Sequence, residues 1–254
     1  MQTKILEVKN LSVRLKVNDT YILKDVSFDL KQGDVLRIGG PNGSGKTTLL
    51  KVLMCQTADY VVDGEIYYYP FSDKNILDFD QKDVLEYHAA LGFVSQKDNY
   101  DGLNKINVED LIEDAISVSK LEKETAIFLF EKYFSDNQRI TLKSIPSKLS
   151  GGEQRLISIF LGLVCKPSCK LMMIDEPLNN LDFKNIMVVS DLLNGIHLDN
   201  KESAMIIVTH CRTITCINRQ RELRDGAMEN TDSKYECHNC LGNPDCDLFY
   251  LKNK

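Results

Sequence analysis

The chain has 254 residues, of which 43% are hydrophobic and 27% are charged, and its formal net charge is −6. This length is enough to bury a sizeable core, as one domain or as a domain with a subdomain. The acidic excess disfavours a nucleic-acid partner, which normally requires a basic face. The longest apolar stretch, residues 156–165, is interrupted by Ser158 and Gly162, so we expect a buried helix there and no membrane span. The N-terminal residues lack the layout of a secretory signal, and we therefore expect a cytoplasmic protein.

The N-terminal part of the chain predicts strands. Residues 5–8, 12–15 and 25–30 are rich in strand-forming residues, and turn-prone pairs such as Lys9-Asn10 separate them. Residues 35–38 form a short apolar run that ends in two glycines, which is typical of a buried strand entering a tight turn. The apolar residues between positions 47 and 54 then follow the spacing of a helix.

The second half of the chain alternates between helices and strands. Residues 108–134 show a charge-rich helical pattern, with Asn107 as a plausible N-cap. A further helix is expected over residues 153–163, and apolar strands over 171–174 and 204–208. Such an alternation predicts a mostly parallel sheet that is covered by helices.

A glycine-rich segment between a predicted strand and a predicted helix fits the pattern Gly-x4-Gly-Lys-Thr. Glycines let backbone N–H groups converge on a polyphosphate, and the start of a helix adds favourable partial charge. Lys46 is expected to reach the β- and γ-phosphates, and the Thr47 hydroxyl to ligate Mg²⁺. The predicted nucleotide-binding residues are Gly40, Pro41, Asn42, Gly43, Ser44, Gly45, Lys46, Thr47 and Thr48.

Two acidic residues follow the apolar run of residues 171–174. The carboxyl ends of strands in open α/β sheets are the places where ligands bind. We expect Asp175 to hold Mg²⁺ and Glu176 to accept a proton from an attacking water.

A second anion-binding platform is predicted at the start of the helix that follows Leu149. Ser150, Gly151 and Gly152 place a hydroxyl and two glycines there, and Glu153 comes next. One nucleotide does not need two phosphate-binding helix starts. The simplest interpretation is that this platform serves the nucleotide of a second subunit.

These three motifs, in this order, resemble those of the ATP-binding cassette (ABC) family, and the resemblance extends to about residue 227. Residues 40–48 look like its Walker A motif, 149–154 like its signature and 170–176 like its Walker B motif. The resemblance implies an α/β fold of the P-loop NTPase type, with a mostly parallel sheet, an antiparallel N-terminal β subdomain and a helical subdomain. It also implies that two cassettes meet head to tail around two ATP molecules.

Three further residues match the family. Gln96 resembles the lid-loop glutamine that senses Mg²⁺, so it is expected to act both in catalysis and as a metal ligand. Asp182 resembles the loop through which two ATPase subunits communicate, and His210 the switch histidine that contacts the γ-phosphate. The family usually has an aromatic residue that stacks on adenine. The aligned position, near Leu15, is aliphatic here, so either Tyr21 replaces it or the base rests on Leu15.

The resemblance implies an ATPase subunit of an ABC transporter, at the cytoplasmic face of a membrane. Separate permease chains would dock over the helical subdomain near residues 97–140, and the second cassette would be the same or a related chain. The alternative is a soluble ABC-type ATPase that works with an assembly complex, as in iron–sulfur assembly. The predicted domains are an ATPase domain over 1–227, with the helical subdomain inserted at about 97–155, and a cysteine-rich tail over 228–254.

The tail contains a cluster of thiols beside a histidine, in the order Cys237, His238, Cys240 and Cys246. Three thiolates and an imidazole are a ligand set that tetrahedral Zn²⁺ accepts. The spacing is shorter than in most paired zinc knuckles. The cluster is therefore either a small zinc knuckle, with Cys237, Cys240 and Cys246 as ligands, or a group of unligated thiols.

Overall fold

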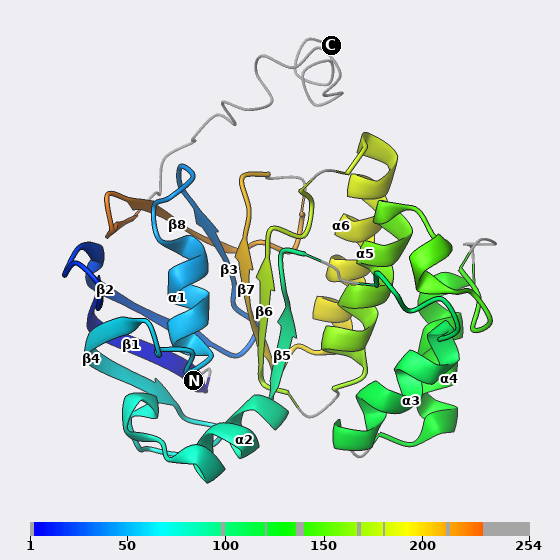
Figure 1. The fold of residues 1–254 in the computed structure, drawn as a ribbon, viewed down its shortest axis with the longest axis horizontal. Coiled ribbons are helices and arrows are strands. Elements are labelled where there is room, and N and C mark those ends of the chain that lie inside the picture. Colours follow the sequence, from blue (N-terminus) through cyan, green and yellow to red (C-terminus); the bar gives the residue numbers. More distant parts are fainter. Residues whose placement is uncertain are drawn as a thin grey trace.

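The computed structural model describes residues 3–97, 100–119, 121–135, 140–166, 169–179, 181–211 and 214–230. It contains an antiparallel three-stranded sheet and a mixed six-stranded sheet, with helices around them (Figure 1). The predicted α/β architecture is confirmed, including the mostly parallel sheet and the antiparallel N-terminal part. None of the described helices is both long enough and apolar enough to cross a membrane.

The antiparallel sheet has the strand order β2-β1-β4, with bounds β1 Lys4–Leu15, β2 Tyr21–Lys31 and β4 Tyr60–Tyr68. The turn predicted at Lys9-Asn10 is wrong, because β1 runs through it as one strand. Asn10 instead adopts a left-handed conformation with φ of 50°, and the register with β2 shifts between Val8 and Leu11. Asparagine tolerates this backbone conformation, so Lys9 and Asn10 form a β-bulge and the strand continues beyond them.

The mixed sheet has the order β5-β6-β7-β3-β8-β9, and every pair but the last is parallel. Its strands are β3 Val35–Gly39, β5 Leu91–Val94, β6 Leu171–Asp175, β7 Ala204–Val208, β8 Arg219–Arg224 and β9 Ala227–Asn230. The parallel strands end at the same edge, so the loops after β3, β5, β6 and β7 meet there. The boundary expected after residue 227 falls inside β9, which is paired with β8.

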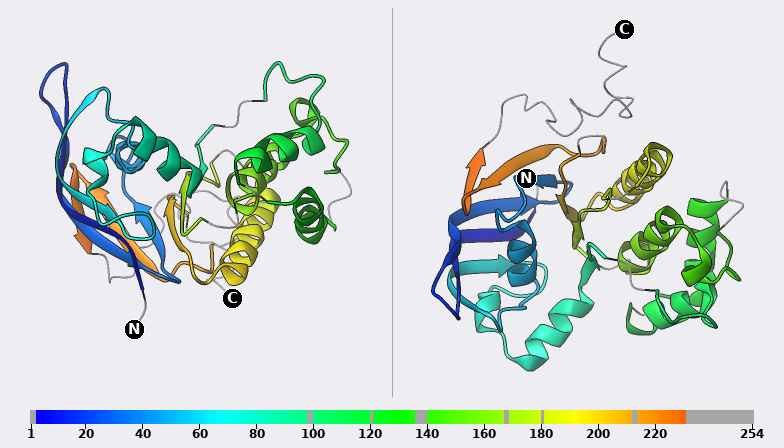
Figure 2. Two further views of the ribbon diagram at one scale, coloured as in Figure 1. Left: turned by 90° about the horizontal axis from the view of Figure 1, so that it is seen from below. Right: turned by 45° about the horizontal axis from the view of Figure 1, so that its top comes forward.

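Helices cover both faces of the mixed sheet. Helix α1 lies on the side of the antiparallel sheet, whereas α3, α4, α5 and α6 form a layer on the other side (Figures 1 and 2). The bounds are α1 Lys46–Leu53, α2 Gln81–Ala89, α3 Val108–Ser119, α4 Lys123–Phe134, α5 Gly151–Ile159 and α6 Phe183–Asp199. A π-helix, Phe160–Val164, continues α5, and 3₁₀ turns occupy Ile76–Asp78 and Pro146–Lys148.

The helical pattern over residues 108–134 is divided into two helices. Asn107 caps the first, because its Oδ1 accepts a hydrogen bond from Asp110 N at 3.0 Å. Glu122 precedes the second helix with an extended backbone, φ −67° and ψ 140°, which interrupts the helical ladder. Both helices belong to the segment between β5 and α5, where the helical subdomain was expected.

The buried side chains form two hydrophobic clusters, one on each face of the parallel strands. Along β6, Leu171 and Met173 belong to the cluster that includes α1 and the antiparallel sheet. Met172 and Ile174 belong to the cluster that includes α3 to α6. Successive strand residues alternate between faces, so a continuous apolar run is what a strand covered on both sides requires.

Candidate nucleotide-binding site

The loop between β3 and α1 has the backbone that the glycine-rich motif predicts. Gly40 has φ of 131°, and a Cβ placed on it would lie 2.1 Å from the Leu223 main-chain oxygen. Gly43 has φ of 80° with open space around it. A glycine is therefore favoured here by the backbone conformation and not by a lack of room for a side chain. Helix α1 then begins without a side-chain cap, which leaves its first N–H groups available to an anion.

Lys46 is directed back towards this loop. Its Nζ donates hydrogen bonds to the main-chain oxygens of Gly40 at 2.8 Å and Pro41 at 2.9 Å. Burial lowers the pKa of Lys46, whereas the negative charges of Glu176 and Asp175 oppose that shift. A buried ammonium beside a concave set of N–H groups is suited to binding a phosphate chain.

Thr47 and Asp175 bring oxygen ligands together across the sheet edge. Thr47 Oγ1 donates to Asp175 Oδ2 at 3.0 Å. Asp175 is 3% exposed, and its Oδ1 has no hydrogen-bond partner among the described residues. Burial raises the pKa of Asp175, and the Thr47 hydrogen bond opposes that rise. A buried carboxylate oxygen without a partner, beside a hydroxyl, is a fitting site for a hard cation such as Mg²⁺.

Glu176 follows Asp175 in an unusual backbone conformation. Its φ is 48°, in the left-handed region that costs a residue with a side chain free energy. Its N–H donates to the Val208 main-chain oxygen at 2.8 Å, and its Oε1 lies 3.4 Å from His210 Nε2. Burial raises the pKa of Glu176, and Lys46 opposes that rise. Burial, with the positive charges of Lys46 and Arg37, lowers the pKa of His210, which favours a neutral imidazole beside this carboxyl group.

Gln96 lies in a bend after β5, and its side chain is exposed. It is at the predicted edge of the sheet. Among the described residues, however, no hydrogen bond joins it to Thr47 or Asp175. Its neighbour Ser95 is tied to α5 through the main-chain oxygen, which accepts a hydrogen bond from Arg155 Nη1 at 2.6 Å.

The platform at the start of α5 lies on the face of the sheet opposite α1. Ser150 and Glu153 form a reciprocal capping box, in which Ser150 N donates to Glu153 Oε2 at 2.9 Å and Glu153 N donates to Ser150 Oγ at 3.4 Å. Glu153 therefore holds the helix start in place. A Cβ on Gly152 would lie 2.4 Å from Asn185 Cγ, whereas a Cβ on Gly151 would meet nothing within 4 Å.

Asp182 caps α6, next to this platform. Its Oδ1 accepts a hydrogen bond from Asn185 N at 2.8 Å, and its Oδ2 one from Asn185 Nδ2 at 3.1 Å. Asn185 thus contacts both the predicted communication loop and Gly152. Sequence analysis did not identify it, because nothing in its local pattern distinguishes it from any polar residue in a first helical turn.

Tyr21 begins β2, and its side chain is 51% exposed. The Arg14 guanidinium lies over its ring, with Cζ 5.5 Å from the ring centroid. Leu23, two residues further on, lies against the glycine-rich loop, since its Cδ2 would be 2.7 Å from a Cβ on Gly45. Tyr21 therefore belongs to the strand that flanks the loop, with its ring open to solvent.

A buried ion pair lies beneath the loop, and sequence analysis did not predict it. Arg37 Nη1 contacts Glu222 Oε1 at 2.9 Å, joining β3 to β8. A Cβ on Gly39 would lie 2.3 Å from Glu222 Oε1, so this glycine makes room for the pair. The available signal was an arginine inside an otherwise apolar strand, because buried charges are rare unless they are paired.

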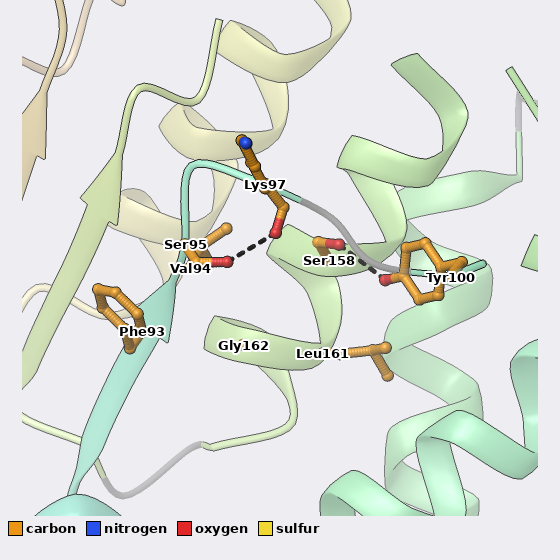
Figure 3. A pocket seen from close by; sticks show the side chains of 8 residues that line it. All are labelled: Phe93, Val94, Ser95, Lys97, Tyr100, Ser158, Leu161 and Gly162. Atoms are coloured by element: carbon orange, nitrogen blue, oxygen red, sulfur yellow. Dashed lines mark hydrogen bonds between the residues drawn. The ribbon is translucent and has the colours of Figure 1, made fainter. Parts of the chain in front are cut away.

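A pocket of about 410 Å³ lies between the end of β5 and α5 (Figure 3). Hydrogen bonds shape its rim, from Ser95 Oγ to the Lys97 main-chain oxygen at 2.8 Å, and between Tyr100 Oη and Ser158 Oγ at 2.7 Å. Its lining residues are Phe93, Val94, Ser95, Lys97, Tyr100, Ser158, Leu161 and Gly162. The pocket thus adjoins both Gln96 and the helix that begins at the second platform.

The predicted zinc ligands, Cys237, Cys240 and Cys246, lie outside the described residues. Within the part of the chain that the structure describes, no group of three or more histidine, cysteine, aspartate or glutamate side chains could hold a metal ion. Zinc is therefore without structural support here.

Comparisons with known proteins identify the family. The family described as "ABC transporter" matches residues 23–179. The chain is 32% identical over 221 residues to the "Probable ATP-dependent transporter ycf16" of Cyanophora paradoxa, covering 82% of this chain and 80% of that protein. It is 30% identical over 218 residues to the "Phosphate import ATP-binding protein PstB" of Saccharolobus solfataricus, covering 80% of this chain and 79% of that protein.

A solved dimeric ATP-binding cassette, described as a post-hydrolysis state bound to ADP and Pi, has the same fold. The TM-score is 0.72 at 23% identity, over 91% of this chain and 100% of that one. The chain therefore belongs to the ABC transporter family, as an ATP-binding domain with ATPase activity.

Proposed function

We propose that this chain is the ATP-hydrolysing subunit of an ABC transporter, which dimerises around two ATP molecules and drives a separate permease. One observation supports this most. Residues 46–47, 175–176 and 210 are far apart in the sequence but lie together at one edge of the sheet. There the Thr47 hydroxyl donates a hydrogen bond to Asp175, and His210 contacts Glu176. A phosphate-binding loop, a cation site and a base beside a histidine are the parts that in-line hydrolysis of ATP requires.

Binding of ATP follows from the loop. The loop N–H groups of residues 42–48 surround the phosphates, since Pro41 has no N–H to donate. The Lys46 ammonium exchanges the main-chain oxygens of Gly40 and Pro41 for phosphate oxygens. Thr47 and Asp175 hold Mg²⁺, with Gln96 as a further ligand, and the bound ion supplies positive charge that offsets the phosphates. The side chain of Tyr21, exposed beside the loop, stacks on the adenine.

Hydrolysis uses the pair formed by Glu176 and His210. The Glu176 carboxylate accepts a proton from the attacking water, and a neutral His210 donates a hydrogen bond to the γ-phosphate. The distance of 3.4 Å between Glu176 Oε1 and His210 Nε2 supports this assignment, because both groups lie close enough to act on the same substrate. Catalysis is then positioning and electrostatic stabilisation, with little covalent chemistry.

The second half of each site comes from another cassette, which is the same or a related chain. Ser150 and Gly151 are exposed at the start of α5, with Glu153 locking the turn beneath them. Open space around Gly151 lets a phosphate approach its N–H group closely. Asp182 is also exposed and caps α6, and in this proposal it communicates with the partner subunit.

The permease docks at the pocket beside Lys97 and Tyr100, between the nucleotide edge and the helical layer. This position lets movement of α5 reach a partner at the cytoplasmic face of a membrane. The names of both relatives, a transporter and an import ATP-binding protein, favour transport over the alternative, a soluble ATPase of an iron–sulfur-assembly type.

Glu176→Gln tests the mechanism. We expect ATP binding to persist and the hydrolysis rate to fall by about 100-fold or more, since the general base is lost. Size-exclusion chromatography with ATP should show a dimer that wild type forms only transiently. Glu202→Gln is the matched control, because Glu202 is exposed and pairs only at the surface with Lys170. Hydrolysis by Glu176→Gln at the wild-type rate would show that Glu176 is not the base.

Affinity purification from solubilised membranes separates the two functions. If the chain is a transporter subunit, hydrophobic permease chains should co-purify with it. Lys97→Glu in the pocket should then prevent co-purification of the permease and leave basal ATPase activity unchanged. Lys82→Glu, on the exposed face of α2, is the control. Recovery of a soluble scaffold in place of membrane chains would favour the assembly ATPase.

A further inference from the structure

We propose that Arg155 is a positioning residue for ATP hydrolysis, which holds Glu176 and the Gln96 loop in their working arrangement. This inference rests on the proposed function, because it assigns a role within the same site. Arg155 does not contact the nucleotide-binding loop in any described hydrogen bond. It acts through the backbone of the segments that carry the catalytic side chains.

Among the described residues, Arg155 donates hydrogen bonds to three main-chain oxygens. Nη2 donates to Asp175 O at 2.9 Å, Nε donates to Pro177 O at 3.2 Å, and Nη1 donates to Ser95 O at 2.6 Å. The side chain is 4% exposed. Figure 3 shows Ser95 at the end of its strand, facing the helix that carries Arg155. One buried cation therefore joins α5 to two loops at the sheet edge.

Two of these oxygens flank Glu176 in the chain. Glu176 has φ of 48°, and such a backbone persists only where the surroundings hold it. Its own N–H is bonded to Val208 O at 2.8 Å. The guanidinium holds the peptide unit directly before Glu176, through Asp175 O, and the peptide unit that follows Pro177, through Pro177 O. These two contacts restrain the backbone on either side of Glu176 and so fix the direction of its carboxylate towards His210. The planar fork of arginine can make such paired contacts, and the single ammonium of lysine cannot reproduce them all.

The third oxygen belongs to the residue before Gln96. The peptide that leads into Gln96 is therefore tied to the same side chain that fixes Glu176. Arg155 also lies in the helix whose first turn is the platform of Ser150 and Glu153. A displacement of α5 would move the Gln96 loop and the Glu176 peptide together. A catalytic group that shifts by about 1 Å can lose on the order of 100-fold in rate, so this anchoring bears on catalysis.

Steady-state kinetics of Arg155→Met and Arg155→Lys test the proposal. We expect Arg155→Met to lower kcat by about 10-fold to 100-fold, with KM for ATP changed by less than about 3-fold, because the binding loop is untouched. Arg155→Lys should recover part of kcat, since it retains the cation and one contact. Arg219→Met is the matched control, because Arg219 is partly buried and bonded to Asp34 and Asp29 far from these loops. It should lose stability while the folded enzyme keeps its kcat.

The outcomes separate cleanly. Wild-type kcat in both Arg155 variants, or an equal loss in Arg219→Met, overturns the positioning role and indicates a purely structural arginine. If Arg155→Met does not fold, Arg155→Lys alone decides the question. We then expect a kcat at least about 3-fold below that of wild type, and a wild-type kcat would contradict the proposal. Absence of hydrolysis in the wild-type chain would instead count against the proposed function.

Discussion

Gly151 and Gly152 stand side by side in the first turn of α5 but have different surroundings. Gly152 is buried against Asn185, whose side-chain atoms lie 2.4 to 2.7 Å from where a Cβ would be. Gly151 is exposed and meets nothing within 4 Å. The motif alone suggests one shared role for both glycines. The packing instead gives Gly152 an internal reason to lack a side chain, whereas the described structure leaves room for a side chain at Gly151.

Alanine substitutions test this difference. Gly152→Ala should lower the free energy of unfolding by about 1–3 kcal/mol, because the new methyl group overlaps Asn185. Gly151→Ala should leave it unchanged or raise it by about 0.5 kcal/mol through helix propensity, while weakening ATP-dependent dimer formation. Urea unfolding of both variants measures the contrast. Equal stabilities of the two variants would contradict the packing argument.

At the scale of elements, a charged cluster on β1 ties this strand to Tyr69, the residue that follows β4. Glu7 accepts hydrogen bonds from Lys4 Nζ at 2.8 Å and from Tyr69 Oη at 2.5 Å, and Lys9 Nζ lies 3.4 Å away. These contacts, the Lys4 bond first, lower the pKa of Glu7 from 4.5 to about 2. The ionised form of the Glu7 carboxyl group is therefore more stable in the folded protein than in the unfolded chain.

The stability contributed by Glu7 should depend on pH. It is fully present above the unfolded pKa of about 4.5 and is lost as pH falls towards the folded value of about 2. Glu7→Gln should cost about 1 kcal/mol of unfolding free energy at pH 7, and the difference from wild type should shrink between pH 4.5 and pH 3. Glu65→Gln, on the exposed side of β4, is the control. A difference that stays constant with pH would contradict the role of the ionised carboxylate.

Across the whole molecule, a pair of hydrogen bonds joins the helical insertion to α6, the helix that follows Asp182. Lys132 Nζ and Tyr133 Oη of α4 both donate to Asp199 Oδ2 at the end of α6, each at 2.5 Å. The Tyr133 ring also lies 3.2 Å from the place of a Cβ on Gly195. This contact connects two parts of the helical layer that are far apart in sequence (Figure 1).

Asp199→Asn should loosen this connection. We expect a loss of about 1 kcal/mol, as for partly exposed charged contacts, and faster amide hydrogen exchange in α4. Exchange in the antiparallel sheet should not change, because that sheet packs in the other hydrophobic cluster. Glu131→Gln, on the exposed surface of α4, is the control. Uniformly faster exchange throughout the molecule would indicate general destabilisation.

Local patterns in the sequence are sufficient to predict the glycine-rich loop, the strand that ends at Asp175 and the sheet edge where these segments meet. Each depends on a short-range rule, namely side-chain periodicity, the φ that glycine permits, or the common edge of parallel strands. Residues such as Lys46, Thr47, Glu176 and His210 follow from those rules together with the family resemblance, and the structure brings them together.

Contacts between distant segments are not encoded in that way. The bulge at Asn10 depends on the register of β1 with β2, and the grip of Arg155 depends on which loops come to lie beside α5. The pairing of Arg37 with Glu222 likewise joins residues 185 positions apart. Such features depend on packing across the whole chain, because the hydrogen-bond and charge partners of a side chain are the groups that the tertiary fold brings next to it.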